Sequence, residues 1–199
     1  MTKVRRAGLV FIVLFVGAFI LSGEIFGGFA DPDQFFIELF QDAGARVRVM
    51  VGSYLLALAG LAFAWFAGGL ADLAKRHAGV LRLTGYAAAG GMLLAAVAAA
   101  TTPMSVWFGA LVDDPGIQQG QGVLPQFAYV ALFMGGLLPA GIFIIGAARS
   151  PGLLPRWLAI ASYPVGALVA IAAITFIPMV LFPVWMIVVV ITAGKQAAT

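Results

Sequence analysis

Residues able to do chemistry are scarce in this chain, and their types exclude several kinds of site. The sequence contains no cysteine, which excludes disulfides, thiolate metal sites and cysteine nucleophiles. His77 is the single histidine, which excludes a haem held by two histidines of one chain and a zinc site that needs two or three. No nucleophile and base fall in the pattern of a hydrolase. We therefore expect no enzyme activity, no cofactor and no bound metal.

The polar and aromatic side chains that remain fall near the ends of apolar segments. Six of them would line one mouth of a helix bundle and form a candidate external surface for a ligand or a partner: Glu24, Arg46, Arg48, Trp107, Gln126 and Tyr129. Arg46 and Arg48 are two residues apart, so they do not share one helix face. We expect them to pair with acids of the same loop or with lipid phosphates, and the alternative is contact with an anion or a substrate.

The composition indicates what kind of fold must position these residues. Of the 199 residues, 63% are hydrophobic and 10% are charged, whereas a soluble domain has about 45–50% apolar and about 25% charged residues. The 8 acids and 11 bases are too few to cover the surface of a soluble protein of this size. This excludes a soluble enzyme, a disordered tail and a nucleic-acid-binding domain.

Long apolar segments predict six transmembrane helices. A bilayer core about 30 Å thick needs about 20 helical residues, and only helices or closed barrels satisfy their backbone groups in lipid. The segments are continuous rather than alternating, which favours helices. The predicted spans are 7–26, 47–70, 83–100, 123–148, 157–176 and 179–193, the last being short at about 23 Å. The predicted fold is all-α, a polytopic membrane helix bundle that forms a single domain over residues 1–199.

Basic residues gather on one side of this predicted topology. Most of the 11 lie in the segments that six spans place together with both termini: Lys3, Arg5, Arg6, Lys75, Arg76, Arg82, Arg149, Arg156 and Lys195. All the acids except Asp72 fall on the other side. The positive-inside rule then places both termini in the cytoplasm of a multi-pass protein of the cell's inner (plasma) membrane. The basic start also fits a signal peptide, but no Ala-x-Ala site follows, so we expect the first span to be retained.

The first external loop predicts a short amphipathic helix that lies on the membrane interface. Asp31 is suited to cap this helix and Pro32 to occupy its first position, and Gly44 is the predicted stop. Between them, apolar residues recur at helical spacing, whereas acids and amides take the opposite face. Such a helix is a lid that packs over the bundle or, alternatively, a docking surface for a partner or a gate over a cavity.

Small residues at four-residue spacing predict seams where helices approach closely. They are Gly60, Ala64 and Gly68 in the second span, Ala87, Gly91 and Ala95 in the third, and Ser162 and Gly166 in the fifth. We expect contacts within the chain at these seams. The alternatives are a seam between identical copies and a seam for another subunit. Pro139 and Pro164 predict kinks in the fourth and fifth spans, and His77 is expected to be solvated.

One turn resembles a turn of known proteins. The stretch Arg149-Ser-Pro-Gly-Leu-Leu-Pro-Arg-Trp-Leu-Ala, between the fourth and fifth spans, is similar to a turn in uncharacterised six-helix bacterial integral membrane proteins of the domain-of-unknown-function type. The segment from Arg46 to Gly52 is similar as well, whereas Ala159 stands where glycine is usual in that group. The resemblance implies the six-helix topology and no particular chemistry.

Two functions fit these observations. The first is a non-catalytic accessory or scaffold subunit of a larger membrane complex, in contact with the lipid bilayer and with other membrane subunits or copies of itself. The alternative is a small-molecule or lipid-binding subunit of a transporter. Its external cavity would be bounded by Glu24, Arg46, Trp107, Gln126 and Tyr129. Neither function involves a nucleic acid.

Overall fold

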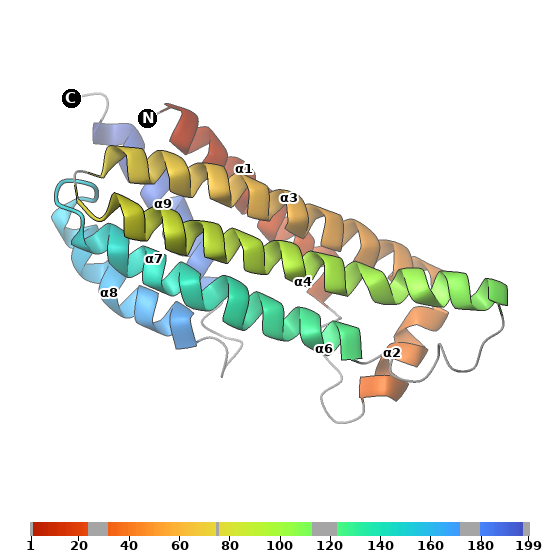
Figure 1. Ribbon diagram of the computed structural model, residues 1–199. Coiled ribbons are helices and arrows are strands. Elements are labelled where there is room, and N and C mark those ends of the chain that lie inside the picture. The colour runs from red at the N-terminus through yellow and green to blue at the C-terminus, as the bar shows by residue number, and fades with distance from the viewer. Residues whose placement is uncertain (1, 24–31, 75, 113–122, 172–179, 197–199) are drawn as a thin grey trace.

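The computed structural model describes residues 2–23, 32–74, 76–112, 123–171 and 180–196, and the regular elements in these segments are helices (Figure 1). In chain order they are α1 (Thr2–Ser22), α2 (Pro32–Gln41), α3 (Ala43–Leu73), α4 (Ala78–Val112), α6 (Val123–Val130), the π-helix η2 (Ala131–Leu137), α7 (Leu138–Arg149), α8 (Arg156–Ala170) and α9 (Leu181–Gln196). The all-α prediction is confirmed.

The long helices lie side by side along one common direction (Figure 1). α1 begins and α9 ends at the same end of the bundle, where the α3–α4 and α7–α8 turns also lie. α2 lies at the opposite end, where it packs against α3 and α6. These two ends are called the terminal end and the α2 end below.

Four helical segments of the described residues are long and apolar enough to cross a membrane: Lys3–Ser22, Ala43–Leu73, Ala78–Thr101 and Gln126–Arg149. They overlap the first four predicted spans and make the chain a candidate multi-pass membrane protein. α8 and α9 have 15 and 16 residues, so each is about 23 Å long and shorter than a bilayer core of about 30 Å. Six spans and the orientation of the termini stay predictions.

Two sequence-based boundaries near the predicted external side are wrong. α2 begins at Pro32 as predicted, but it ends at Gln41, and Gly44 lies in the first turn of α3 instead of stopping α2. The break falls at Asp42 because its side chain caps a new helix. α4 continues through Pro103 to Val112, although a loop is predicted from Thr101 onward. We attribute this to α6, which runs beside α4 and supports the backbone around the proline.

The fourth predicted span is one continuous rod with a π-helical segment in its middle. The N–H of Leu138 donates to the carbonyl of Phe133, five residues back, instead of four. Pro139 follows in the first turn of α7, and it has no N–H to donate to the preceding turn. The wider π turn therefore adapts the rod to the proline just beyond it.

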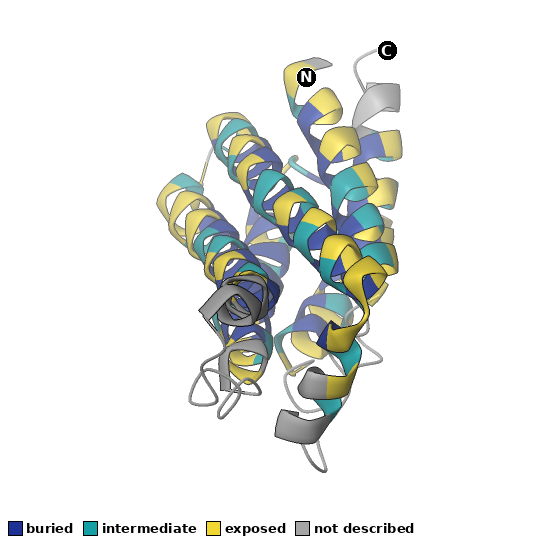
Figure 2. Cartoon of the chain, turned by 90° about the vertical axis from the view of Figure 1, so that its right-hand side faces the viewer, coloured by how far each residue is buried: buried dark blue, intermediate teal, exposed yellow. Residues whose placement is uncertain are grey.

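Aromatic rings fill the middle of the bundle. We define the aromatic cluster as Phe11, Phe15, Phe63, Phe66, Phe143, Phe182 and Trp185, all buried and supplied by α1, α3, α7 and α9. Phe63 is central, because its ring centroid lies 5.2 Å from that of Phe11, 5.4 Å from that of Phe143 and 5.2 Å from that of Phe182. Figure 2 shows buried residues on the inward faces of the helices and exposed residues on the outward faces.

Glycines bring other helices into backbone contact. A Cβ added at Gly91 of α4 would lie 2.0 Å from the carbonyl carbon of Gly135 in η2. A Cβ added at Gly141 of α7 would lie 2.4 Å from the carbonyl oxygen of Gly166 in α8. Real Cβ atoms do not approach so closely, so Gly91 and Gly141 must be glycine at the present helix spacing. These two pairs are called the glycine contacts.

The structure distributes the predicted seam residues between two environments. Those buried between helices are Gly60, Gly91, Ala95, Ser162 and Gly166. Ala64 and Gly68 are half-buried and line a hollow on the outside of α3, and Ala87 is exposed on α4. Small residues at the same four-residue spacing are therefore buried between helices at some positions and lie on the outer surface at others.

Candidate functional site

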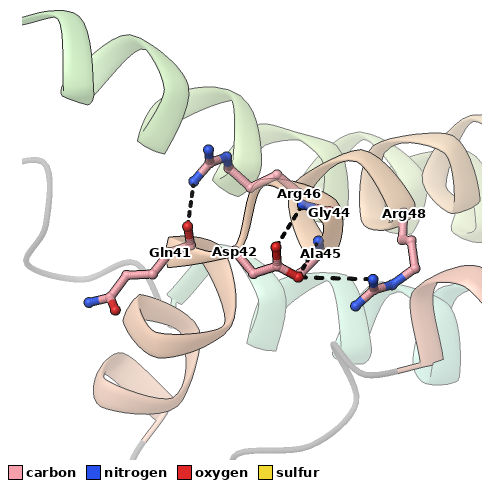
Figure 3. Close-up of polar contacts among 6 residues, drawn as sticks. All are labelled: Gln41, Asp42, Gly44, Ala45, Arg46 and Arg48. Atoms are coloured by element: carbon pink, nitrogen blue, oxygen red, sulfur yellow. Dashed lines mark hydrogen bonds and ion pairs between the residues drawn. The ribbon is translucent and has the colours of Figure 1, made fainter.

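The corner between α2 and α3 is built around the carboxylate of Asp42 (Figure 3). The backbone N–H of Gly44 donates to Oδ1 of Asp42 at 2.9 Å, and the N–H of Ala45 donates to Oδ2 at 3.1 Å. These bonds satisfy two of the N–H groups that the first turn of α3 leaves without partners in the helix. Asp42 thereby fixes the point at which α2 ends and α3 starts.

The two arginines of the predicted surface flank this corner and point to opposite sides of it (Figure 3). The Nη1 of Arg46 donates to the carbonyl oxygen of Phe40 and, at 3.3 Å, to that of Gln41, so it binds the last turn of α2 rather than an acid. The Nη1 of Arg48 lies 4.0 Å from Oδ2 of Asp42, an ion pair within the loop as predicted. Arg46 thus helps to hold α2 on α3, whereas Arg48 pairs with the cap of its own helix.

The corner also shifts the acidity of Asp42. The N–H groups of Gly44 and Ala45 are the largest cause that lowers the pKa of this carboxyl below its usual range, and Arg48 and Arg46 lower the pKa further. All of these partners stabilise the charged form. Asp42 is therefore ionised at neutral pH and acts as a fixed cap.

A hollow of about 530 Å³ opens on the outer side of the corner. Its walls come from α2 and the start of α3: Phe35, Glu38, Leu39, Asp42, Ala45 and Arg48. Apolar surface from Phe35 and Leu39 thus lies beside charged groups of both signs. The shared residues make the hollow and the Asp42 corner one candidate site.

The structure gathers only part of the predicted external surface. Arg46 and Arg48 lie at the corner, and Gln126 is exposed on α6, the helix that α2 contacts. Tyr129 is half-buried, and its ring centroid lies 4.2 Å from that of Phe133 in η2, with the two rings tilted by 33°. Trp107 lies in α4, in a stretch where only the backbone is described, and Glu24 lies outside the described residues. In the described part of the chain, no group of three or more metal-binding side chains occurs.

Sequence reasoning missed two features of the terminal end. Ser150 donates to the carbonyl of Arg76 at 3.1 Å and to that of Gly146 at 3.0 Å, so one hydroxyl joins the α7–α8 turn to the α3–α4 turn. His77 adopts a left-handed backbone with φ 64° just before α4, a conformation in which histidine is several-fold enriched. His77 is exposed, as expected, but its main role here is in the geometry of the turn.

The comparisons with known proteins leave this site without a named relative. No protein-family model, no curated protein and no solved structure matches the chain. The resemblance of the turn at Arg149 therefore stays an expectation. The function has to be argued from the corner and its hollow.

Proposed function

We propose that this protein is a non-catalytic accessory subunit of a larger membrane complex, and that a partner subunit docks at the α2–α3 corner. The observation that carries the proposal is the hollow beside a capped helix junction. α2 is held at a set position by Asp42 and Arg46, and it presents apolar and charged side chains together on its outer side. A surface of this kind is pre-organised, which lowers the entropic cost of binding.

The lining residues favour a protein partner over a small molecule. Arginine and aromatic side chains are enriched at protein interfaces, and Phe35 and Arg48 provide both types here. The volume of about 530 Å³ lies within the range of small-molecule sites. However, such sites bury most of the ligand, and the residues that wall this hollow come from α2 and α3 alone. A ligand-binding subunit of a transporter is thus the alternative.

The distribution of charge supports an orientation. The described bases of the terminal end are Lys3, Arg5, Arg6, Arg76, Arg82, Arg149, Arg156 and Lys195. At the α2 end, Arg46 and Arg48 are accompanied by Glu38 and Asp42. By the positive-inside rule, this bias orients the terminal end toward the cytoplasm, so the corner and its partner lie on the external side.

Site-specific photo-cross-linking in native membranes tests the docking proposal. A photoreactive phenylalanine analogue replaces the exposed Glu38, and in a matched control it replaces Val13, which is 71% exposed in the middle of α1. We expect a protein adduct of one defined mass from position 38 and none from position 13. The adduct should disappear when Asp42→Ala removes the cap of α3. A protein that yields only monomer and lipid adducts at both positions contradicts an accessory-subunit role.

A further inference from the structure

A second surface feature lies at the terminal end, on the outer side of α1 and α3. Two adjoining hollows, of about 330 Å³ and about 420 Å³, share the side chains of Lys3 and Trp65 and together form one groove. Lys3 and Arg6 lie at the groove's charged mouth, and Val10 of α1 and Ala62 of α3 lie deeper along it. The groove takes no part in the α2–α3 corner.

Small residues form the floor of the groove and large rings stand at its sides. The small residues are Ala7, Ala62, Ala64, Gly68 and Gly69. Trp65 is 68% exposed and Tyr86 is 51% exposed, so both rings project from the helices instead of filling the core. The result is a channel with an apolar floor between two exposed rings.

The charges at the mouth are mainly positive. Lys3 and Arg6 are exposed, and neither side chain forms a hydrogen bond or an ion pair with any residue in the described segments. Asp72 is the acid that lines the groove, and it is already paired with Arg82. A ligand at the mouth therefore meets two available cations, which is the charge that an anionic group requires.

The polarity of the groove changes along its length in the same order as the layers of a bilayer. From Lys3 to Val10 along α1, the groove descends about 10 Å at about 1.5 Å per residue, from charged residues into a wholly apolar stretch. An exposed tryptophan and an exposed tyrosine beside it suit the interface between headgroups and acyl chains. This order of charge, aromatic ring and apolar channel matches a single phospholipid.

We infer that the groove is a binding site for an anionic phospholipid. Its phosphate lies between the Lys3 ammonium and the Arg6 guanidinium, and one acyl chain runs along the small-residue floor past Trp65. The inference needs the chain to span a membrane, but it does not depend on the partner of the corner or on which side the terminal end faces.

A transmembrane helix of a partner is the competing occupant, and Tyr86 argues against it. Helices dock on small residues because these let two backbones approach. A Cβ added at Gly68 would lie 2.9 Å from the hydroxyl oxygen of Tyr86, so this side chain already lies over the glycine. A flexible acyl chain fits the space that remains, whereas Tyr86 keeps a second backbone from reaching Gly68.

Tryptophan quenching by brominated phospholipids in vesicles provides the test. The quenching of Trp65 is obtained by subtracting the quenched fluorescence of Trp65→Phe from that of the unmodified protein. The same subtraction with Trp157→Phe gives the quenching of Trp157, which is also exposed at this end. We expect brominated phosphatidylglycerol to compete for the site at Trp65 about fivefold or more better than brominated phosphatidylcholine. Trp157 should show a weaker preference.

Two variant pairs separate the groove from general basic charge. Lys3→Gln with Arg6→Gln should abolish the preference at Trp65, whereas Arg149→Gln with Arg156→Gln removes the same charge from the same end and should preserve it. Ala64→Leu, which keeps both cations but narrows the channel, should reduce quenching of Trp65 by both lipids. Circular dichroism confirms that each variant is folded.

Three results overturn the inference. The first is equal quenching of Trp65 by the two lipids in the unmodified protein. The second is an equal loss of preference in both charge variants, which would indicate a diffuse basic surface. The third is quenching of Trp157 with none at Trp65, which would show that a protein covers the groove. The photo-cross-linking result at position 38 is independent of all three.

Discussion

In the aromatic cluster, α1, α3, α7 and α9 contact one another through side-chain rings, whereas at Gly91–Gly135 and Gly141–Gly166 the backbones themselves meet. The ring centroids of neighbouring pairs in the cluster are 5.1 to 6.3 Å apart. An added Cβ at either glycine contact would have no room. One bundle therefore uses two opposite ways to hold helices together.

The difference matters because burial of apolar surface drives little association in lipid, where the surroundings are already apolar. Close packing between the helices must supply the stability instead. Rings provide it through many dispersion contacts and favourable ring geometry, and they tolerate small shifts because side chains can adjust. Glycine contacts provide it through close backbone approach, and a backbone cannot adjust in the same way.

α7 belongs to both regions. Gly141 faces α8, and Phe143, two residues later, packs against the rings of Phe63 and Trp185. Residues two apart lie on different faces of a helix, so α7 joins the two kinds of contact. A change on one of its faces should therefore leave the other largely intact, and the predictions below use this separation.

The largest expected effect is that of Gly91→Ala. The new Cβ would lie 2.0 Å from the carbonyl carbon of Gly135, so α4 and η2 must move apart and lose their contact. We expect the free energy of unfolding to fall by about 3 kcal/mol, the upper part of the range for overpacking. Equilibrium unfolding in mixed detergent and dodecyl sulfate micelles measures it.

Gly90→Ala is the matched control, since it makes the same change one residue earlier on the same helix. A Cβ at Gly90 would meet no atom within 4 Å, and alanine has a higher helix propensity than glycine. Gly90→Ala should be neutral or stabilising. Equal losses in both variants would show that the close contact with Gly135 does not explain the effect of Gly91→Ala.

Phe63→Ala should have a smaller effect, although it removes far more atoms. Phe63 lies at the centre of the aromatic cluster, and its loss leaves a cavity among the rings of Phe11, Phe143 and Phe182. We expect a loss of about 2 kcal/mol, below the usual cost of a buried Phe→Ala change, because the transfer from water is absent in lipid. The same unfolding assay, with the exposed Phe127→Ala as control, measures it.

A Phe63→Ala protein that is less stable than Gly91→Ala would reverse the proposed ranking. The aromatic cluster would then contribute more stability than the glycine contacts, and the rings would not adjust to the cavity. Phe63→Leu distinguishes the causes, since it restores volume without the ring. Recovery of most of the stability in Phe63→Leu indicates that the loss came from volume and not from ring geometry.

Ser162→Ala tests the polar link between α8 and α9. The indole N–H of Trp185 donates to the hydroxyl of Ser162 at 2.8 Å, and this hydroxyl donates to the carbonyl of Leu158 at 2.7 Å. Without the serine, the buried indole N–H loses its acceptor, so we expect a loss of about 1 kcal/mol. A shift in the fluorescence of Trp185 should accompany it.

Ser53→Ala is the comparison for this loss. Ser53 is also buried and also donates to the carbonyl four residues back, at 2.7 Å, but no side-chain donor to it occurs among the described residues. Ser53→Ala should lower the free energy of unfolding by less than Ser162→Ala does. Equal costs would show that the bond to the preceding turn, common to both serines, is what matters.

The sequence predicts the helices well and their contacts only in part. The apolar segments locate the four long candidate spans, because a helix that crosses lipid must be continuously apolar, and residue spacing identifies Gly91 and Gly166. Their partners Gly135 and Gly141 are not predicted, because the π-helix changes which side of the rod Gly135 faces. The adjacent Gly135 and Gly136, shortly before Pro139, are a local signal for that change.

Of the residues at the corner, the predicted surface contains only Arg46 and Arg48. The sequence pattern predicts Asp31 as the cap of the first-loop helix and assigns no cap to the next span, where the structure has Asp42 in that role. An aspartate two residues before a glycine, at the start of a long apolar run, is itself a capping signal. The groove was missed because Ala64 and Gly68 have the same spacing whether a helix covers them or not. Only the position of Tyr86 on the neighbouring helix distinguishes the two cases.

The smallest expected effect is on the α2–α3 corner, which should respond to pH while both core regions do not. Because the pKa of Asp42 is lowered in the folded corner, its cap stabilises the corner fully above about pH 4, the usual aspartate range. This contribution is lost as the pH falls through the lowered pKa. Acid should therefore release α2 from α3 without unfolding the aromatic cluster or the glycine contacts.

Because the chain has no natural cysteine, spin labels can be attached to introduced cysteines in pairs. The first pair is Gln41→Cys on α2 with Gln126→Cys on α6. The second pair is Val13→Cys on α1 with Ile187→Cys on α9. Acid should broaden the distribution of label-to-label distances in the first pair and leave that of the second pair unchanged. Asp42→Asn is the decisive variant, because asparagine also caps a helix but does not titrate. If the first pair still broadens in Asp42→Asn, the response belongs to another group such as Glu38, and Asp42 is not what holds the corner.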